Sequence, residues 1–243
     1  MGAVTVSVVI AAHNEGPSIA AVVEGCRAHT PDLAEVLVVD DGSTDDTAKR
    51  AEDAGARVVR MGVNQGKGAA LRRGIREARG DVVVFIDGDG QDDPREVTTL
   101  LDALGPDVAM VVGSRFLGRF HRGAITPVNK RGNVALTSVL NALFGTRFTD
   151  SQAGFRAARR SALTALDLRA RAYDIETEVL IQVHRAGGRV VEVPVDRSAR
   201  THGESGLSSV RDGSRILARM LRLRLGLYRA SGSDVRREGS PSK

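Results

Sequence analysis

Short apolar runs rich in β-branched residues alternate with helix-like segments through the first half of this 243-residue chain, and this alternation restricts the possible folds most. The strand-like runs occupy residues 6–11, 35–39, 56–61 and 82–86, and the segments typical of helices are 19–28, 44–54 and 69–78. Successive parallel strands need long crossover connections, which helices supply. The chain is therefore expected to form an α/β fold, with a doubly wound, mostly parallel sheet and helices on both faces.

The second half of the chain is less regular. Helices are expected at 94–104, 134–144 and 175–186, strands at 108–112 and 190–193, a turn at 150–155, and loops at 119–131 and 197–208. The loop at 119–131 is basic and is expected to become ordered on binding. Residues 1–208 are expected to form one domain, followed by a basic amphipathic helix over 209–230 and a disordered tail over 231–243.

The fourth expected strand, residues 82–86, ends in Asp87-Gly88-Asp89. Residues two apart on an extended chain point to the same side, and glycine lets a ligand approach the backbone closely. Paired carboxylates suit a hard divalent cation, Mg²⁺ or Mn²⁺, and open α/β sheets bind ligands at the carboxyl ends of their strands. Such a metal usually serves a phosphate or diphosphate.

A solvated acidic turn is the alternative interpretation of this motif, because Asp-Gly pairs are common in turns. An EF-hand is not favoured, since the distal glutamate is missing and a strand precedes the motif. Two phosphate-binding loops are also excluded. The turn after the first strand lacks the dinucleotide-binding glycine pattern, and the glycines around Lys67 do not form a Walker A loop.

The composition indicates an anionic partner, because the formal net charge is +5 and the isoelectric point is about 10.0. Arginine greatly outnumbers lysine, which fits either phosphate recognition or codon bias in a GC-rich genome. Nucleic acid is not expected as the partner, since aromatic residues are scarce and tryptophan is absent.

The single cysteine, Cys26, excludes an internal disulfide and fits a reducing compartment. No apolar run reaches the roughly 20 residues that span a bilayer, and no basic-then-apolar signal begins the chain. The protein is therefore expected on the cytosolic side.

Seven motifs in order resemble the family 2 glycosyltransferases and, within them, the polyprenyl-phosphate (dolichyl-phosphate) sugar synthases. They lie at residues 8–15, 39–45, 64–68, 87–94, 113–115, 150–156 and 200–205, so the likeness covers roughly residues 4–207. The resemblance implies a GT-A type, Rossmann-like fold. It also implies an inverting, metal-dependent transfer of a hexose from a nucleotide sugar, GDP-mannose or UDP-glucose, to a polyprenyl phosphate.

The resemblance also assigns roles to residues. The donor would be bound by Ala11, Glu15, Val39, Asp41, Lys67, Asp87, Gly88 and Arg200. The divalent cation would be held by Asp87 and Asp89, with a carbonyl oxygen from Gln91, and it would neutralise the leaving diphosphate. The catalytic residues would be Asp89, Arg115 and Glu178, with Arg115 and Arg200 making charge-assisted contacts to phosphate.

The acceptor separates two subgroups of the family. A phosphate oxygen is already anionic at neutral pH and needs positive charge rather than a strong base, and Lys130, Arg131 and Ser205 are the candidates to bind it. Lys130 and Arg131 are expected just before a helix. A sugar hydroxyl would instead need a general base, for which Glu178 is the first candidate and Glu176 the second.

The chain departs from the family pattern in two places. Ala11 and His13 stand where the family has a proline and an aromatic residue, which bears on the identity of the nucleotide. Gly206 replaces a lysine of the late loop. A phosphate contact is then missing, or is supplied by Lys67 or Arg197.

The last expected helix carries Arg211, Arg215, Arg219 and Arg222 at helical spacing beside apolar residues. Such a helix either lies on an anionic membrane surface or packs its apolar stripe on the domain. The first alternative would make the protein peripheral on the cytosolic face of the membrane.

A sugar-phosphate nucleotidyltransferase and a non-catalytic anion-binding protein remain rival functions, and the sequence does not indicate the oligomeric state.

Overall fold

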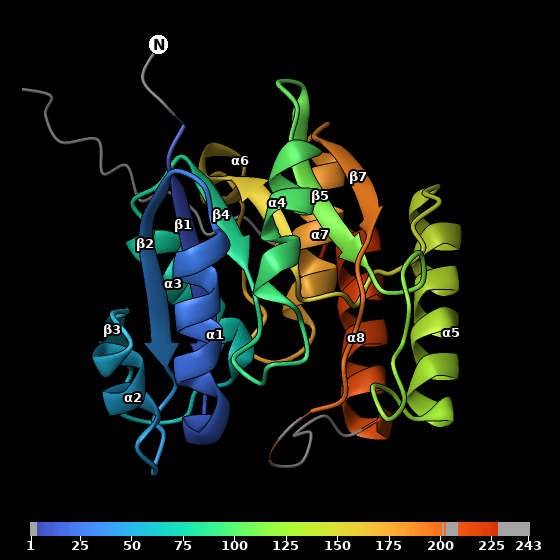
Figure 1. The fold of residues 1–243 in the computed structure, drawn as a ribbon. Coiled ribbons are helices and arrows are strands. Elements are labelled where there is room, and N and C mark those ends of the chain that lie inside the picture. Colours follow the sequence, from blue (N-terminus) through green and yellow to red (C-terminus); the bar gives the residue numbers. More distant parts are fainter. Residues whose placement is uncertain (1–3, 201, 203–208, 228–243) are drawn as a thin grey trace, which may run out of the picture.

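The computed structural model describes residues 4–200, 202 and 209–227, and its centre is one sheet of seven strands (Figure 1). The strand order is β3-β2-β1-β4-β6-β5-β7. All neighbouring strands are parallel except β6, which runs antiparallel to both β4 and β5. The strands are β1 (Val6–Ala12), β2 (Leu33–Asp40), β3 (Arg57–Arg60), β4 (Val82–Phe85), β5 (Val108–Ser114), β6 (Arg156–Arg159) and β7 (Arg189–Pro194).

Helices cover both faces of this sheet, as the alternating sequence predicts (Figure 1). One face packs against α1 (Gly16–His29), α2 (Thr47–Asp53) and α4 (Val97–Asp102), and the short 3₁₀ helix η1 (Pro94–Glu96) contacts α1 and α4. The other face packs against α3 (Lys67–Glu77), α5 (Pro127–Phe144), α6 (Arg160–Thr164), α7 (Ile175–Arg185) and α8 (Ser209–Arg224).

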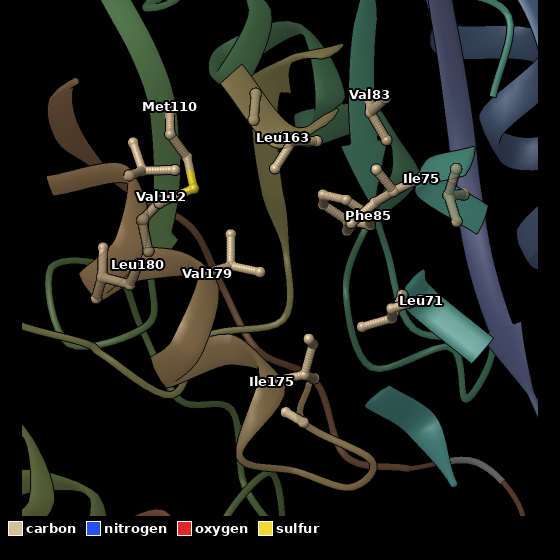
Figure 2. Close-up of a cluster of buried hydrophobic side chains, with 14 of the residues drawn as sticks. Leu71, Ile75, Val83, Phe85, Met110, Val112, Leu163, Ile175, Val179 and Leu180 are labelled. Atoms are coloured by element: carbon tan, nitrogen blue, oxygen red, sulfur yellow. The ribbon is translucent and has the colours of Figure 1, made fainter. Parts of the chain in front are cut away.

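The two hydrophobic clusters follow from the period of two along each strand. In β4, Val83 and Phe85 point toward α3 and α7, whereas Val82 and Val84 point toward α1 and α4. Figure 2 shows the first cluster, in which Leu71 and Ile75 of α3 approach Phe85 from one side of the sheet. A strand buried on both faces needs apolar residues at every position, which explains the continuous run at residues 82–86.

The expected α/β architecture is confirmed, and all six strands expected from the sequence are present. The sequence did not indicate β6, because Arg156 and Arg159 flank only two alanines and the segment lacks β-branched residues. Those alanines, Ala157 and Ala158, are fully buried between β4 and β5.

The expectation that Lys130 and Arg131 precede a helix is wrong. The helix α5 begins at Pro127, and both residues lie in its first turn and the turn that follows. Its N-cap is Thr126, whose side-chain oxygen accepts a hydrogen bond from the Asn129 N–H at 3.2 Å. A threonine cap followed by proline is a strong helix start, and it overrides the unfavourable Gly132 in the next turn.

A glycine shapes the loop before α3. Gly66 has φ +94°, and a Cβ atom there would lie 2.2 Å from the carbonyl oxygen of Arg171. Only glycine allows this approach, which brings Lys67 at the start of α3 to the carboxyl edge of the sheet. Among the described residues, no helix has the length and apolar character required to cross a membrane.

Candidate active site

A cleft of about 1080 Å³ opens at the carboxyl edge of β1 and β4. Parallel strands place the residues that follow them along this common edge. The polar part of the cleft is lined by Ala11, His13, Glu15, Asp41, Lys67, Asp87, Gly88, Asp89, Gln91, Arg115, Glu176, Arg197 and Arg200. The rest lies between α5, α8 and residues 120–126, and its lining includes Phe120, Ile125, Val128, Leu136 and Ile216.

The guanidinium of Arg197 lies among three carboxylates at the end of β4. One of its terminal nitrogens is 3.8 Å from Asp87 Oδ2 and 3.7 Å from Asp89 Oδ2, and the other pairs with Asp92. The first nitrogen also donates a hydrogen bond to Gln91 Oε1 at 3.0 Å. The two aspartates of the motif therefore converge on one positively charged group.

The environment of these carboxylates shifts the pKa of Asp87 and the pKa of Asp92 in opposite directions. Burial raises the pKa of Asp87, but Lys67 and Arg197 outweigh burial and lower it to about 2. Burial raises the pKa of Asp92, and the neighbouring Asp87 adds to this effect while Arg197 opposes it. Asp87 is thus held ionised, as a metal-binding or cation-binding carboxylate must be.

The ammonium group of Lys67 joins Asp87 to α7. It lies 2.7 Å from Asp87 Oδ1 and 2.9 Å from Glu176 Oε1, and 5.7 Å from the centre of the Tyr173 ring. The backbone at Gly154 passes so closely that a Cβ atom there would be 3.2 Å from Asp87 Oδ2 and 3.3 Å from Lys67 Nζ.

A second ion-pair chain crosses the mouth of the cleft. Arg200 donates to Glu15 Oε1 at 3.1 Å and to Asp89 Oδ2 at 2.9 Å. Burial raises the pKa of Glu15, and Arg200 counteracts it. This chain joins the loop after β1, the loop after β4 and the segment after β7.

The residues after β2 support the loop that leads to α3. Asp41 is buried, and its carboxylate accepts hydrogen bonds from the backbone N–H groups of Gln65 and Gly66, both at 2.7 Å. The Nδ1 atom of His13 lies 3.0 Å from the Asp41 carbonyl oxygen. Val39 lies in the hydrophobic core at 0% exposure and is not part of the cleft lining.

Arg115 lines the cleft from the end of β5. Its guanidinium holds the fully buried carboxylate of Asp150 through two hydrogen bonds of 2.7 and 2.8 Å. A bidentate pair of this kind fixes the side chain, so that its remaining N–H groups have a defined direction.

The structure does not place Glu178 in the cleft. Its carboxylate is fully buried and accepts hydrogen bonds from the backbone N–H groups of Arg169 and Ala170, while Arg219 lies 3.3 Å away. This position does not suit a general base, and Glu176 is the carboxylate of α7 that lines the cleft.

Two of the three residues expected to bind an acceptor phosphate lie outside the cleft lining. Lys130 and Arg131 are exposed and outside the cleft lining, and Lys130 Nζ lies 4.9 Å from the centre of the Phe120 ring. Ser205, like Gly206, lies outside the described residues.

No functional role is expected from the sequence for Asp92, Arg156 or Tyr173, which the structure places at or beside the site. Arg156 is fully buried, and its guanidinium donates to the carbonyl oxygens of Ser151, Ala153 and Glu176. It thereby ties the loop that contains Gly154 to the start of α7. Burial lowers its pKa to about 10. Its position as the last residue of the motif at 150–156 is the signal that could have indicated this role.

Two carboxylates, two arginines and a lysine are suited to hold a metal-bound diphosphate. Mg²⁺ and Mn²⁺ are commonly bound by one or two carboxylates and complete their shells with phosphate oxygens and water. Asp87 and Asp89, which both approach the same nitrogen of Arg197, fit this requirement. Within the described part of the chain, no group of three or more His, Cys, Asp or Glu side chains forms a closed metal site.

Comparison with known proteins agrees with this chemistry. Residues 7–166 match the model of the family described as glycosyl transferase family 2. The glycosyltransferase AglJ of Haloferax volcanii is 34% identical over 212 residues, which are 86% of this chain and 69% of that protein. The undecaprenyl-phosphate mannosyltransferase of Micrococcus luteus is 33% identical over 82% of this chain and 86% of its own length.

The solved structures include glucosyl-3-phosphoglycerate synthase from Mycobacterium tuberculosis in complex with Mn²⁺, UDP and glucosyl-3-phosphoglycerate. It has a TM-score of 0.73 and 31% sequence identity, over 94% of this chain and 82% of the other. The same enzyme with Mg²⁺ and UDP is equally similar.

Proposed function

This chain belongs to glycosyl transferase family 2 and is a glycosyltransferase, and we propose that it transfers a hexose from a nucleotide sugar to a polyprenyl phosphate. The transfer inverts the anomeric carbon and depends on Mg²⁺ or Mn²⁺. Mannose from GDP-mannose is the first choice of donor, and glucose from UDP-glucose is the second.

The observation that carries this proposal is the contrast between the two parts of the cleft. The part at the ends of β1 and β4 is lined by charged side chains, whereas the part between α5 and α8 is lined mainly by apolar and small residues. An acceptor with a phosphate at one end and a hydrocarbon chain at the other matches both parts. A small, fully polar acceptor would match only the first.

The charged part supplies the groups that the transfer needs. Asp87 and Asp89 would hold the cation, which acts as a Lewis acid on the diphosphate. Arg115 and Arg200 would donate hydrogen bonds to the phosphates, and Glu15 after β1 and Asp41 after β2 would bind the nucleoside. The acceptor oxygen attacks the anomeric carbon in line with the departing diphosphate, which gives inversion.

The position of the carboxylates of α7 supports a phosphate acceptor over a hydroxyl acceptor. Glu178 is buried away from the cleft, and Glu176 pairs with Lys67. A phosphate oxygen needs no general base, so catalysis would rest on positioning and electrostatic stabilisation. Relatives that bear the names of polyprenyl-phosphate transferases support the same choice, and with such an acceptor we expect the protein to work peripherally at a membrane.

Transfer of radiolabelled sugar tests the proposal. GDP-mannose and UDP-glucose are offered in parallel to a short polyprenyl phosphate with Mn²⁺ or Mg²⁺, and label is extracted into organic solvent. We expect extractable label that disappears with a chelator and in Asp89→Ala, but persists in Asp93→Ala, which removes a carboxylate from the same loop. Label confined to the aqueous phase would contradict the lipid acceptor, and the absence of turnover with a wider panel of nucleotide sugars would contradict the donor class.

A further inference from the structure

The outer sides of α5 and α8 expose apolar side chains. The exposed large hydrophobic residues of the described chain, apart from Val4 and Val63, are Leu117, Val128, Val134, Val139, Leu217, Leu221, Leu225 and Leu227. The two helices pack side by side on one flank of the molecule (Figure 1). We call the exposed surface of residues 117–142 and 211–227 the α5–α8 face.

The helix α5 is exposed along most of its length. Only Thr137 and Leu140 of its residues are buried, and Leu136, Leu143 and Phe144 are partly buried against the core. Its opposite side presents Val128, Ala135, Val139 and Ala142, which recur at intervals of seven, four and three residues, and so share one side of the helix. A water-facing helix normally carries charged residues there, so this side is suited to contact with an apolar phase.

The large apolar residues of α8 lie in two environments. Ile216, Met220 and Leu223 pack into the core, which accounts for the apolar stripe expected from the sequence. Leu217 and Leu221 remain 39% and 45% exposed, one turn apart. The helix is therefore packed on the domain and still has an outward apolar stripe.

The charges on this face have one sign. Residues 108–149 contain no aspartate or glutamate, whereas Arg119, Arg122, Lys130 and Arg131 are exposed there. On α8, the exposed charged residues are Arg211, Arg215, Arg222 and Arg224, and the acidic Asp212 is buried beside Arg215.

We propose that the α5–α8 face docks on an anionic lipid bilayer, with its apolar side chains in the interface and its arginines and lysines against lipid phosphates. Exposed leucines and valines on a face whose own exposed charged residues are basic match the chemistry of such a surface. A second copy of the chain fits less well, since a two-fold contact would bring this face onto itself and oppose like charges.

The α5–α8 face lies beside the cleft, so docking would bring the cleft to the bilayer. This step of the inference rests on the proposed function. Val128 is both 68% exposed and part of the cleft lining, and Ile216 lines the cleft on the inner side of α8. The apolar part of the cleft therefore opens beside the face. Docking would let a polyprenyl chain pass from the bilayer into the cleft without crossing water.

Vesicle sedimentation of the full chain tests this inference. The protein is mixed with vesicles of phosphatidylcholine alone, or of phosphatidylcholine and phosphatidylglycerol, at low and high salt. We expect it to sediment with the anionic vesicles, and binding to weaken with salt. Val139→Asp combined with Leu221→Asp should weaken binding by about tenfold or more, because each such side chain contributes roughly that factor when buried. Arg222→Gln should weaken it by roughly fivefold.

The control is Val4→Asp, an exposed apolar residue at the opposite end of β1 from the cleft, which should bind vesicles like the wild type. Transfer to a short, water-soluble polyprenyl phosphate without vesicles should be unchanged in all variants, because none of the altered residues lines the cleft. Equal vesicle binding by the double variant and the control would overturn the docking. It would also be overturned if the wild type self-associated through Val139 and Leu221 and did not bind vesicles. Anionic vesicle binding without any transfer would overturn the proposed function and leave the docking in place.

Discussion

Arg197 and Asp92 form an ion pair in which the side chain of Asp92 is 1% exposed, and the same guanidinium approaches both aspartates of the Asp87-Gly88-Asp89 motif. Arg197 thus compensates the charge of Asp92 and adds to the compensation of Asp87 and Asp89, which also pair with Lys67 and Arg200. An uncompensated buried carboxylate is strongly destabilising, so Arg197 stabilises the fold as well as the site.

Replacing this arginine should make the protein depend on a divalent cation for stability. Arg197→Gln is expected to lose about 3–5 kcal/mol of unfolding free energy without metal, and to gain more from added Mn²⁺ than the wild type does. Thermal unfolding with and without Mn²⁺ measures both effects. Arg95→Gln is the matched control, since the exposed Arg95 of the nearby η1 pairs with Asp93, which is only partly buried. An identical Mn²⁺ response in wild type and Arg197→Gln would contradict this role.

The close packing around Gly154 predicts that adding a side chain there lowers the activity without lowering the stability of the protein. In Gly154→Ala, the new methyl group meets Asp87 Oδ2 at 3.2 Å and Lys67 Nζ at 3.3 Å, and both must move. Misplacing these groups should lower kcat/KM by about tenfold or more. In Gly105→Ala the nearest atom is Asp107 Oδ1 at 3.6 Å, so this control should keep full activity. Equal activity of the two variants would show that Asp87 and Lys67 tolerate displacement.

The attachment of α8 depends on a buried ion pair. Arg219 donates to Asp174 Oδ2 at 2.8 Å and lies 3.3 Å from Glu178 Oε1, and both carboxylates are buried. Arg219→Met should destabilise the protein by about 3–5 kcal/mol in urea unfolding, whereas Arg222→Met on the exposed side should change it by less than about 0.5 kcal/mol. Adding Glu178→Gln to Arg219→Met should restore part of the loss. Additive losses would contradict the pairing.

The lone cysteine provides a probe of unfolding. Cys26 is fully buried in α1, and burial raises the pKa of its thiol to about 12. Since the thiolate is the reactive form, the native thiol should stay protonated and unreactive toward a disulfide reagent at pH 8. Labelling should follow the unfolding transition in urea. Rapid stoichiometric labelling of the native protein would show that α1 opens independently.

The fold could be predicted where the chain is periodic. Runs such as residues 82–86 are long and apolar enough that packing and local preference agree. The strand β6 could not be predicted, because its burial comes from its neighbours β4 and β5 rather than from its own side chains. The start of α5 was missed because Gly132 weakens the helical pattern, although the Thr126 cap is strong.

The site was predictable where function resides in residues adjacent in sequence. Asp87 and Asp89 lie in the cleft, as their position after a strand indicates. The choice between Glu176 and Glu178 was not predictable, because residues two apart on a helix point in nearly opposite directions and the sequence does not say which side faces the cleft. The position of Arg197 among three aspartates arises from tertiary packing, so no local pattern could indicate it.

The most direct test of the central claim is a competition between two acceptors in one reaction. A labelled donor that supports turnover is offered together with a short polyprenyl phosphate and 3-phosphoglycerate, at equal concentrations and with Mn²⁺. Because part of the cleft is apolar, the label should enter the organic-extractable product almost entirely. Predominant label in water-soluble glycosyl phosphoglycerate would contradict the claim that the cleft between α5 and α8 selects a lipid phosphate.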